Sequence, residues 1–306
     1  MNKLKSFLCG LLTFMVCAVL FVGCGAGQPT EPTPTPPTPP TITTTTISLA
    51  EAKAIILNAL ALDGQGSVAP QSVQAGNRDF LEKLGKFTFT SNEYLWDVDK
   101  KVIDQEYHSR GNFEYANYDF VSYYLCDSEF DQPTSEVCLA DETVYVNNLK
   151  TGLIREQNKE AIDWANILNC FLTEESFNYV YKDEVQKVTT DAGFSLSLIG
   201  DIKGYMQILA LLTDGPVGED FDQLWESYSK MLEERYSQAI IDECHLLVQI
   251  NFDKNENIIG ADAEMFGLSP QPDGKNIQNK ESFHVVKTDE EFTQPQWLTD
   301  YLAGNN

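Results

Sequence analysis

The sequence predicts an α+β fold in which antiparallel strands pack against several helices. Two observations predict it. Short segments with alternating apolar and polar residues, typical of half-buried strands, recur between Lys86 and Phe266. Segments with apolar residues at helical spacing lie before, between and after them. The region that starts at Ser48 is about 260 residues long, enough for one sizeable core or two smaller ones.

The first helix is expected to begin at Ser48. Ser48 and Glu51 have the spacing of a capping box, in which each side chain caps the backbone N–H of the other residue. We expect Asp63 and Gly64 to end this helix, and a second short helix to span residues 79–84. The apolar residues that share one face of the first helix are Leu49, Ala52, Ile56, Ala59 and Leu60.

An aromatic region follows, from Lys86 to Arg155, and it predicts a meander of antiparallel strands. Residues 147–152 supply turn residues between two of these strands. Asp97 and Asp99 are interpreted as part of a solvated hairpin end, because carboxylate pairs are common in so acidic a chain. The expected strand segments are 87–89, 94–96, 113–118, 120–125 and 143–146.

The second half of the chain predicts a mixture of helices and strands. The clearest helix is Phe221 to Tyr236, whose apolar stripe is typical of a core-facing surface. The clearest strand is 244–252, and residues 253–257 are expected to turn it into a hairpin with 258–266. The other expected elements are a helix at 162–171, strands at 194–198 and 283–286, and a closing helical turn at 297–302.

The N-terminus has the features of an export signal. Lys3 and Lys5 precede an uncharged run from Ser6 to Gly23, which is short for a permanent membrane-spanning helix. The segment Leu20-Phe21-Val22-Gly23-Cys24 that ends this run resembles the lipobox of bacterial lipoproteins, although Phe21 stands where an aliphatic residue is usual.

The lipobox resemblance implies that residues 1–23 are a signal peptide and that Cys24 carries a diacylglyceryl group. Two acyl chains hold a protein stably on a membrane, whereas one chain binds only marginally. We therefore expect a protein anchored by lipid to the extracytoplasmic side of the cell membrane. The alternatives are an uncleaved anchor, or an ordinary secretory signal followed by an incidental cysteine.

Residues 24–47 are interpreted as the lipidated cysteine and a linker, and residues 48–306 as the extracytoplasmic domain. From Gln28 to Thr46 the chain consists almost wholly of proline and threonine, and it holds seven of the 13 prolines. Proline fixes φ and lacks a backbone donor, so the linker is expected to favour an extended polyproline conformation.

The charge of the chain excludes some partners. Loss of the signal peptide removes two lysines and no acid, so 19 basic residues face 46 acidic ones and the net charge is −27. We expect no nucleic-acid partner, because phosphate binding depends on clustered lysine and arginine residues. We also expect no cofactor, since the sequence has no phosphate-binding glycine loop.

The cysteines after Cys24 could form a disulfide outside the cytoplasm. Of Cys126, Cys138, Cys170 and Cys244, the first two have hairpin-like spacing, and a Cys126–Cys138 bridge is the pairing we expect if one forms. The alternative is that they are buried thiols, because cysteine is among the most readily buried residues.

Catalytic and metal-binding motifs are scarce, so we do not expect an enzyme. His108, His245 and His284 lie in strand-like surroundings with no recognisable nucleophile, which favours structural or surface roles. Asp253, Asn255, Asn257 and Glu264 have the spacing of a calcium loop, but Ile258 occupies the position that requires glycine. We therefore expect a hairpin turn there, and no metal site.

The layout from Ser48 to Phe266, with the segments 143–148 and 250–255, resembles the LolA and LppX families of envelope lipoproteins. The resemblance implies a half-barrel, in which an antiparallel sheet curves around helices and encloses an apolar cavity for acyl chains. It transfers no functional residue, because that cavity has no residue-level motif.

Three classes of function remain open: a carrier or sensor of an apolar, lipid-like ligand, a module that binds an envelope protein or wall polymer, and an enzyme without a recognisable motif. Aromatic residues such as Tyr94, Trp96 and Phe113 are expected on both faces of the sheet, so something must cover the second face. The expected covers are the helices at 162–171 and 221–232, and space that they leave would admit a lipid-like ligand.

Overall fold

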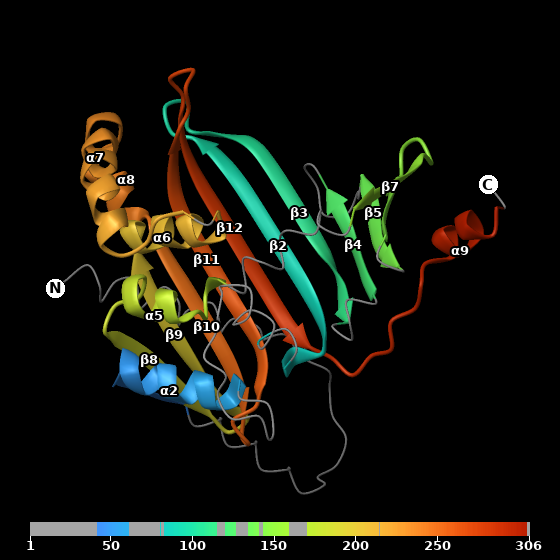
Figure 1. Ribbon diagram of the computed structural model, residues 1–306, viewed down its shortest axis with the longest axis horizontal. Helices are drawn as coiled ribbons and strands as arrows, with labels where there is room; N and C mark the ends of the chain where they lie inside the picture. The colour runs from blue at the N-terminus through green and yellow to red at the C-terminus, as the bar shows by residue number, and fades with distance from the viewer. Residues whose placement is uncertain are drawn as a thin grey trace, which may run out of the picture. The chain divides into compact units, whose positions relative to one another are not determined.

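The protein is described by a computed structural model that covers residues 42–60, 80, 83–114, 120–126, 134–140, 143–158, 170–213 and 215–304, with the backbone alone at 120–126 and 158. These residues form the predicted α+β fold, built on one curved antiparallel sheet that does not close (Figure 1). The sheet has 12 strands in the order β1-β8-β9-β10-β11-β12-β2-β3-β4-β5-β6-β7.

Consecutive strands are mostly neighbours in the sheet, and the helices lie in connections between strands or after the last strand. The strands are β1 (Thr43–Ser48), β2 (Lys86–Asp97), β3 (Val102–Glu114), β4 (Phe120–Cys126), β5 (Ser135–Ala140), β6 (Thr143–Asn148), β7 (Ile154–Asn158), β8 (Glu184–Thr190), β9 (Gly193–Asp201), β10 (His245–Asp253), β11 (Ile258–Pro270) and β12 (Asn276–Lys287). The helices are α2 (Leu49–Leu60), α5 (Glu174–Tyr179), α6 (Ile202–Leu212), α7 (Glu219–Arg235), α8 (Gln238–Glu243) and α9 (Gln296–Leu302).

The strands have two distinct faces because successive side chains point to opposite sides. We call the side that packs against α2 and α6 the helix face and the opposite side the outer face. In β10 the residues on the helix face are buried, and those between them are half-buried on the outer face. Strand pairing carries this division across the sheet, since Val248 lies opposite Ala263 and Ala263 opposite Phe283. The buried β10 residues are Leu246, Val248, Ile250 and Phe252.

Two helices cover one half of the helix face. In Figure 1, α2 lies over β8, and α6 crosses β9, β10 and β11. The predicted start of α2 is confirmed, because the Glu51 backbone N–H donates to Ser48 Oγ at 3.2 Å. The α6 residue Tyr205 lies directly on Gly267 of β11, where a Cβ atom would be 1.9 Å from the Tyr205 ring. Only glycine permits so close an approach.

The α7 helix is confirmed, but it does not cover the centre of the helix face. Its Tyr228 hydroxyl donates to the Leu268 carbonyl at 3.1 Å, and Tyr236, which follows the helix, donates to the Ile277 carbonyl at 3.2 Å. The helix therefore packs at the adjoining ends of β11 and β12. Leu224 of this helix is 57% exposed, so not all of its apolar residues face the core.

The closing helix α9 packs on the outer face of β5 and β6. Leu298 of this helix is fully buried with Cys138 and Tyr145, and the Tyr145 and Tyr301 rings meet edge to face at 5.9 Å. The Tyr301 hydroxyl also donates to Glu156 of β7 at 3.1 Å. These contacts confirm a C-terminal helix in the range predicted for it.

The folded region starts earlier than the sequence suggests. Residues 43–47, assigned above to the linker, belong to β1, which pairs along its length with β8. The helix expected at 162–171 lies outside the described residues, apart from the buried Cys170 and Phe171. Asp63 and Gly64, the expected end of the first helix, also lie outside them. Tyr94 and Trp96 share the outer face, and Phe113 lies on the helix face. Among the described residues, no helix has the length and apolar character needed to cross a membrane.

Candidate functional site

Beyond the part that α6 covers, the helix face is more polar and more exposed. On β2 the helix-face residues Phe87 and Phe89 are buried, whereas Ser91, Glu93 and Leu95 are half-buried. The neighbouring strands show the same opening, and Tyr107 on β3 is 43% exposed. We call this region the polar window, which consists of Ser91, Glu93, Leu95, Gln105, Tyr107, Ser109, Asn279 and Glu281.

Two carboxylates meet at the centre of the polar window. Glu93 of β2 and Glu281 of β12 lie directly opposite each other in the antiparallel register. Residues in this position have Cβ atoms ~5 Å apart, and like charges there repel each other. Neither carboxylate forms an ion pair with a lysine, arginine or histidine of the described residues.

Two uncharged polar side chains complete this centre. The Asn279 amide nitrogen donates to a Glu281 carboxylate oxygen, and the Tyr205 hydroxyl lies close to the same amide. The side-chain oxygen of Asn279 is buried and has no hydrogen-bond partner among the residues that the structure describes. Because Gly267 lies opposite Asn279, the close packing of Tyr205 on Gly267 brings its hydroxyl to this position.

The electrostatics of the pair favour one bound proton near neutral pH. Burial, with a further contribution from the charge of Glu93, raises the pKa of Glu281 from 4.5 to about 7. Burial also raises the pKa of Glu93 and, more strongly, that of Tyr205. The hydrogen bond from Asn279 lowers the pKa of Glu281, but by less than burial raises it. The site is therefore rich in hydrogen-bond acceptors and lacks a compensating cation.

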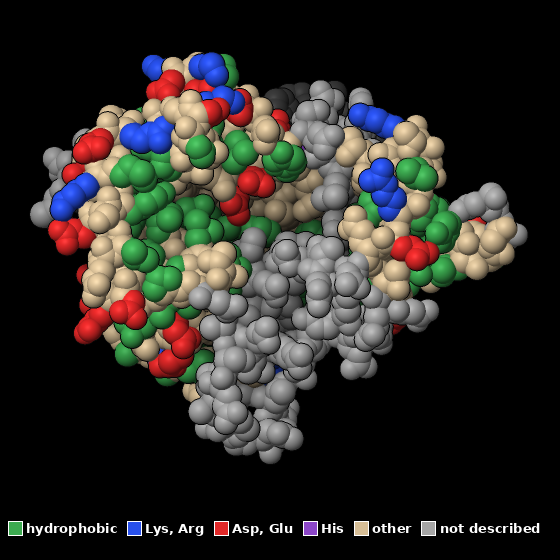
Figure 2. All heavy atoms as spheres, turned by 45° about the horizontal axis from the view of Figure 1, so that its top comes forward, with side chains coloured by type: hydrophobic (Ala, Val, Ile, Leu, Met, Phe, Trp, Pro, Cys, Tyr) green, Lys and Arg blue, Asp and Glu red, His purple; other side chains and the backbone are tan. Residues whose placement is uncertain are grey.

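The pair has an apolar border. Met265 lies opposite Glu281 on β11, and Phe283 follows two residues further along β12, so both share the helix face with the pair. On the other side, Leu95 and the Tyr107 ring supply half-buried or exposed apolar surface. In the space-filling view, acidic side chains lie beside a hollow among hydrophobic ones (Figure 2). Such a combination of apolar surface and a few polar groups is typical of sites for small organic ligands.

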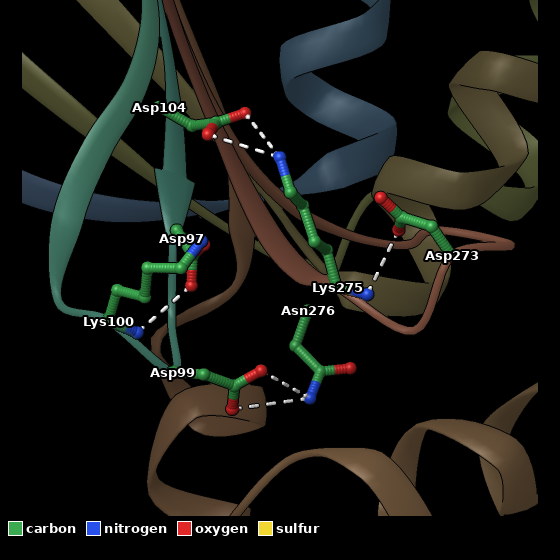
Figure 3. Close-up of polar contacts among 7 residues, drawn as sticks. All are labelled: Asp97, Asp99, Lys100, Asp104, Asp273, Lys275 and Asn276. Carbon is green, nitrogen blue, oxygen red and sulfur yellow. Dashed lines mark hydrogen bonds and ion pairs between the residues drawn. The ribbon is translucent and has the colours of Figure 1, made fainter.

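A second acidic cluster lies at the tips of the β2–β3 and β11–β12 hairpins (Figure 3). Asp97 and Asp99 occur at this hairpin end as predicted, but Asp97 is not solvated, since its side chain is only 2% exposed. Its carboxylate accepts from the Lys100 backbone N–H at 2.9 Å and from Lys100 Nζ at 2.7 Å. These hydrogen bonds lower the pKa of Asp97. We call this group the hairpin-tip cluster, and its members are Asp97, Asp99, Lys100, Asp104, Asp273, Lys275 and Asn276.

The three histidines all lie on strands and on the outer face, away from the polar window. Each has a carboxylate neighbour: His108 with Glu106, His245 with Glu264, and His284 with Asp262. The Glu264 carboxylate, 3.9 Å from His245 Nε2, raises the pKa of His245. No group of three or more potential metal ligands gathers among the described residues.

The hairpin predicted at Asp253 is confirmed. Asp253 Oδ1 accepts from the backbone N–H groups of Asn255 and Asn257 at 2.8 and 2.9 Å. Glu264, the last ligand of the calcium-loop spacing, lies opposite Leu247 in the middle of the hairpin strands. The Asp253 carboxylate thus stabilises the turn, as the simple interpretation requires.

Strand pairing does not support the expected Cys126–Cys138 bridge. Cys138 is a free, buried thiol opposite Ser122, whereas Cys126 lies opposite His108. The two positions are therefore four residues apart along β4. This is about 13 Å along a strand, which exceeds the Cα separation that a disulfide allows. Burial raises the pKa of the Cys138 thiol to about 12. Cys24 lies outside the described residues.

The sequence analysis did not single out Glu93 or Glu281. The sequence did contain an indication, because each glutamate stands at a position that the alternation of its strand assigns to the apolar side. Glu93 follows Phe87 and Phe89 in this alternation, and Glu281 precedes Phe283 and Val285. A carboxylate at an inward position is costly to bury and therefore informative. Their meeting depends on the register between β12 and β2, which are separated by most of the chain.

Comparisons with known proteins give little further information. No protein-family model matches the chain, and no curated protein matches it. Solved structures that resemble it include a DUF1329 family protein from Desulfovibrio piger, with 6% identity, a TM-score of 0.23, and coverage of 72% of this chain and 95% of the other. An outer membrane lipoprotein-sorting protein domain from Vibrio parahaemolyticus has 7% identity and the same TM-score, with coverage of 76% and 99%. At these TM-scores the likenesses support no conclusion about function.

Proposed function

We propose that this chain is a lipid-anchored extracytoplasmic protein that binds a lipid-like ligand on the helix face of its sheet. The observation that carries the proposal is the polar window. Elsewhere the helix face is closed by buried apolar side chains, as expected for a filled core. Among the described residues of this face, half-buried carboxylates lie beside accessible apolar surface only at the window.

The character of the window refines the expectation from the sequence. An acyl-chain cavity alone would be lined by apolar residues, and Phe87, Phe89 and Phe113 are too deeply buried to line an open one. A ligand that fits the window has a polar group for the glutamates and an apolar part for Leu95 and Tyr107. We therefore propose an amphiphile as the ligand.

The test of ligand binding uses the mature chain, residues 24–306, with Cys24→Ser so that no covalent acyl group confuses the result. The purified protein is extracted with organic solvent and any lipid is identified by mass spectrometry. The stripped protein is then titrated with the neutral fluorescent probe N-phenyl-1-naphthylamine. Saturable probe binding that an alkyl amphiphile displaces supports the proposal. If the protein carries no lipid and shows no saturable binding, the carrier function is wrong and an interaction module becomes the better hypothesis.

The membrane anchor is a separate part of the proposal and rests on the lipobox-like segment that ends at Cys24. In the full chain, Cys24→Ser should abolish metabolic labelling by a fatty acid analogue, because it removes the proposed acylation site. Cys138→Ser is the matched control and should leave labelling intact, since that thiol is buried. Labelling that persists in Cys24→Ser would show that the lipobox interpretation is wrong.

A further inference from the structure

We infer that the Glu93–Glu281 pair is the recognition site for the ammonium head group of an amphiphile. This inference rests on the proposed function and specifies the class of ligand. It is drawn from the direct opposition of two carboxylates in one register, from their surroundings of hydrogen-bond acceptors, and from the apolar surface beside them.

The hydrogen-bonding capacity of the site favours a ligand that donates. Ionised carboxylates only accept hydrogen bonds. Next to them, the side-chain oxygen of Asn279 is a buried acceptor with no partner in the described part of the chain. The Asn279 amide nitrogen already donates to Glu281. A protonated amine presents several N–H donors, and it could serve both carboxylates and the unpartnered oxygen.

The charge of the site leads to the same class of ligand. Two carboxylates held face to face repel each other, and no basic side chain of the described residues is paired with either. A cation between them removes the repulsion and forms two charge-assisted hydrogen bonds, which are stronger than hydrogen bonds between neutral groups. A carboxylate or phosphate head group would find no basic partner and would add to the repulsion.

The surroundings also provide for an apolar tail. Tyr107 lies directly opposite Glu93 on β3 and is 43% exposed, and Leu95 lies on the same face two residues from Glu93. A tail that leaves the pair in this direction covers apolar surface that the described helices leave open. A free amine without a tail gains none of this burial, so the amphiphile is the better ligand.

The experiment compares ligands that share a tail and differ in head-group charge. Decylammonium, 1-decanol and decanoate are each titrated as competitors of N-phenyl-1-naphthylamine bound to the mature Cys24→Ser chain at pH 8. Ethanolamine serves as the amine without a tail. We expect decylammonium to bind at least about tenfold more tightly than decanoate, as one charge-assisted interaction allows. Its affinity should rise roughly tenfold between pH 6 and pH 8 as Glu281 loses its proton, while that of 1-decanol stays constant.

Variants assign the preference to the pair. Glu93→Gln and Glu281→Gln should each bring decylammonium and decanoate to within about threefold of each other, with binding of 1-decanol retained. Glu264→Gln removes the same charge from the outer face of β11 and should leave the preference intact. The two pair variants test the site independently if one of them fails to fold.

The outcomes separate this inference from the proposed function. Equal binding of all three decyl ligands, or preference for decanoate, overturns the ammonium site but leaves an amphiphile-binding protein. Displacement by ethanolamine as effective as that by decylammonium also overturns it, since the ligand is then a small amine. If none of the decyl ligands displaces the probe, the proposed function itself fails.

Discussion

The same two β-hairpins carry two acidic centres with opposite electrostatics. At the hairpin tips, Asp97 is paired with Lys100 and Asp104 with Lys275, and the pKa of Asp97 is lowered. In the middle of the strands, Glu93 and Glu281 face each other without a lysine, and the pKa of each is raised. The tip arrangement is what a stable turn requires, whereas the mid-strand arrangement costs stability.

This difference separates a structural cluster from a candidate binding site. Paired and hydrogen-bonded carboxylates stabilise the native state near neutral pH. An unpaired buried carboxylate destabilises it, and such cost is more often found at functional sites than elsewhere. Net acidity does not distinguish the two clusters, but the presence or absence of basic partners does.

The largest effect should come from Glu281→Gln. The pKa of Glu281 is raised in the folded state, so its contribution to stability is fully present below the unfolded value of 4.5 and is lost as the pH rises through about 7. At pH 8 the variant should therefore be more stable than the wild type by up to about 3 kcal/mol, at 1.36 kcal/mol per pKa unit. Urea unfolding between pH 5 and pH 8 measures the change.

The matched control is Glu264→Gln on the outer face of the adjacent strand. The His245 imidazole, 3.9 Å away, lowers the pKa of Glu264, so the substitution should not stabilise the protein at pH 8. A Glu281→Gln variant that is no more stable than the wild type at pH 8 would show that the mid-strand pair is not strained, and the contrast with the hairpin tips would be lost.

The second effect concerns the packing that places Tyr205 over the pair. Gly267→Ala puts a Cβ atom into the Tyr205 ring. Because overpacking of this kind typically lowers the free energy of unfolding by 1–3 kcal/mol, we expect the variant to be less stable by about 2 kcal/mol. The same substitution in a Tyr205→Leu background should cost clearly less, which a double-mutant cycle by urea unfolding measures. Equal costs in both backgrounds would mean that Tyr205 does not rest on Gly267.

Part of this arrangement could be predicted from the sequence, because it is local. The β10–β11 hairpin combines strict alternation with turn residues, and the capping box at Ser48 lies within four residues, so both were found. Strand β8 was missed because its polar residues hide the alternation, and β1 because its threonines continue the composition of the linker, although threonine favours strands.

The candidate site could not be predicted in the same way, because it depends on contacts between distant segments. Glu93 and Glu281 become neighbours only through the pairing of β12 with β2. Tyr205 reaches them from α6, a helix that the sequence did not suggest. The expected disulfide lacks support from strand pairing for a related reason, since the hairpin-like spacing of Cys126 and Cys138 says nothing about which residues of β4 and β5 pair.

The smallest effect should come from the hairpin tips, where Asp97→Asn removes a charge that is paired with Lys100. Because its pKa is lowered in the folded state, Asp97 contributes stability above its unfolded value of 3.8, and this contribution is lost as the pH falls through its folded pKa. We expect the variant to melt a few degrees below the wild type at pH 7 and the difference to shrink below about pH 4. Asp104→Asn is the control: its ion pair with Lys275 is longer, at 3.3 Å, and its carboxylate is more exposed than that of Asp97, so its loss should be close to undetectable. If Asp97→Asn raises the melting temperature at pH 7, the hairpin-tip carboxylates are strained like the mid-strand pair, and the lysines do not distinguish the two centres.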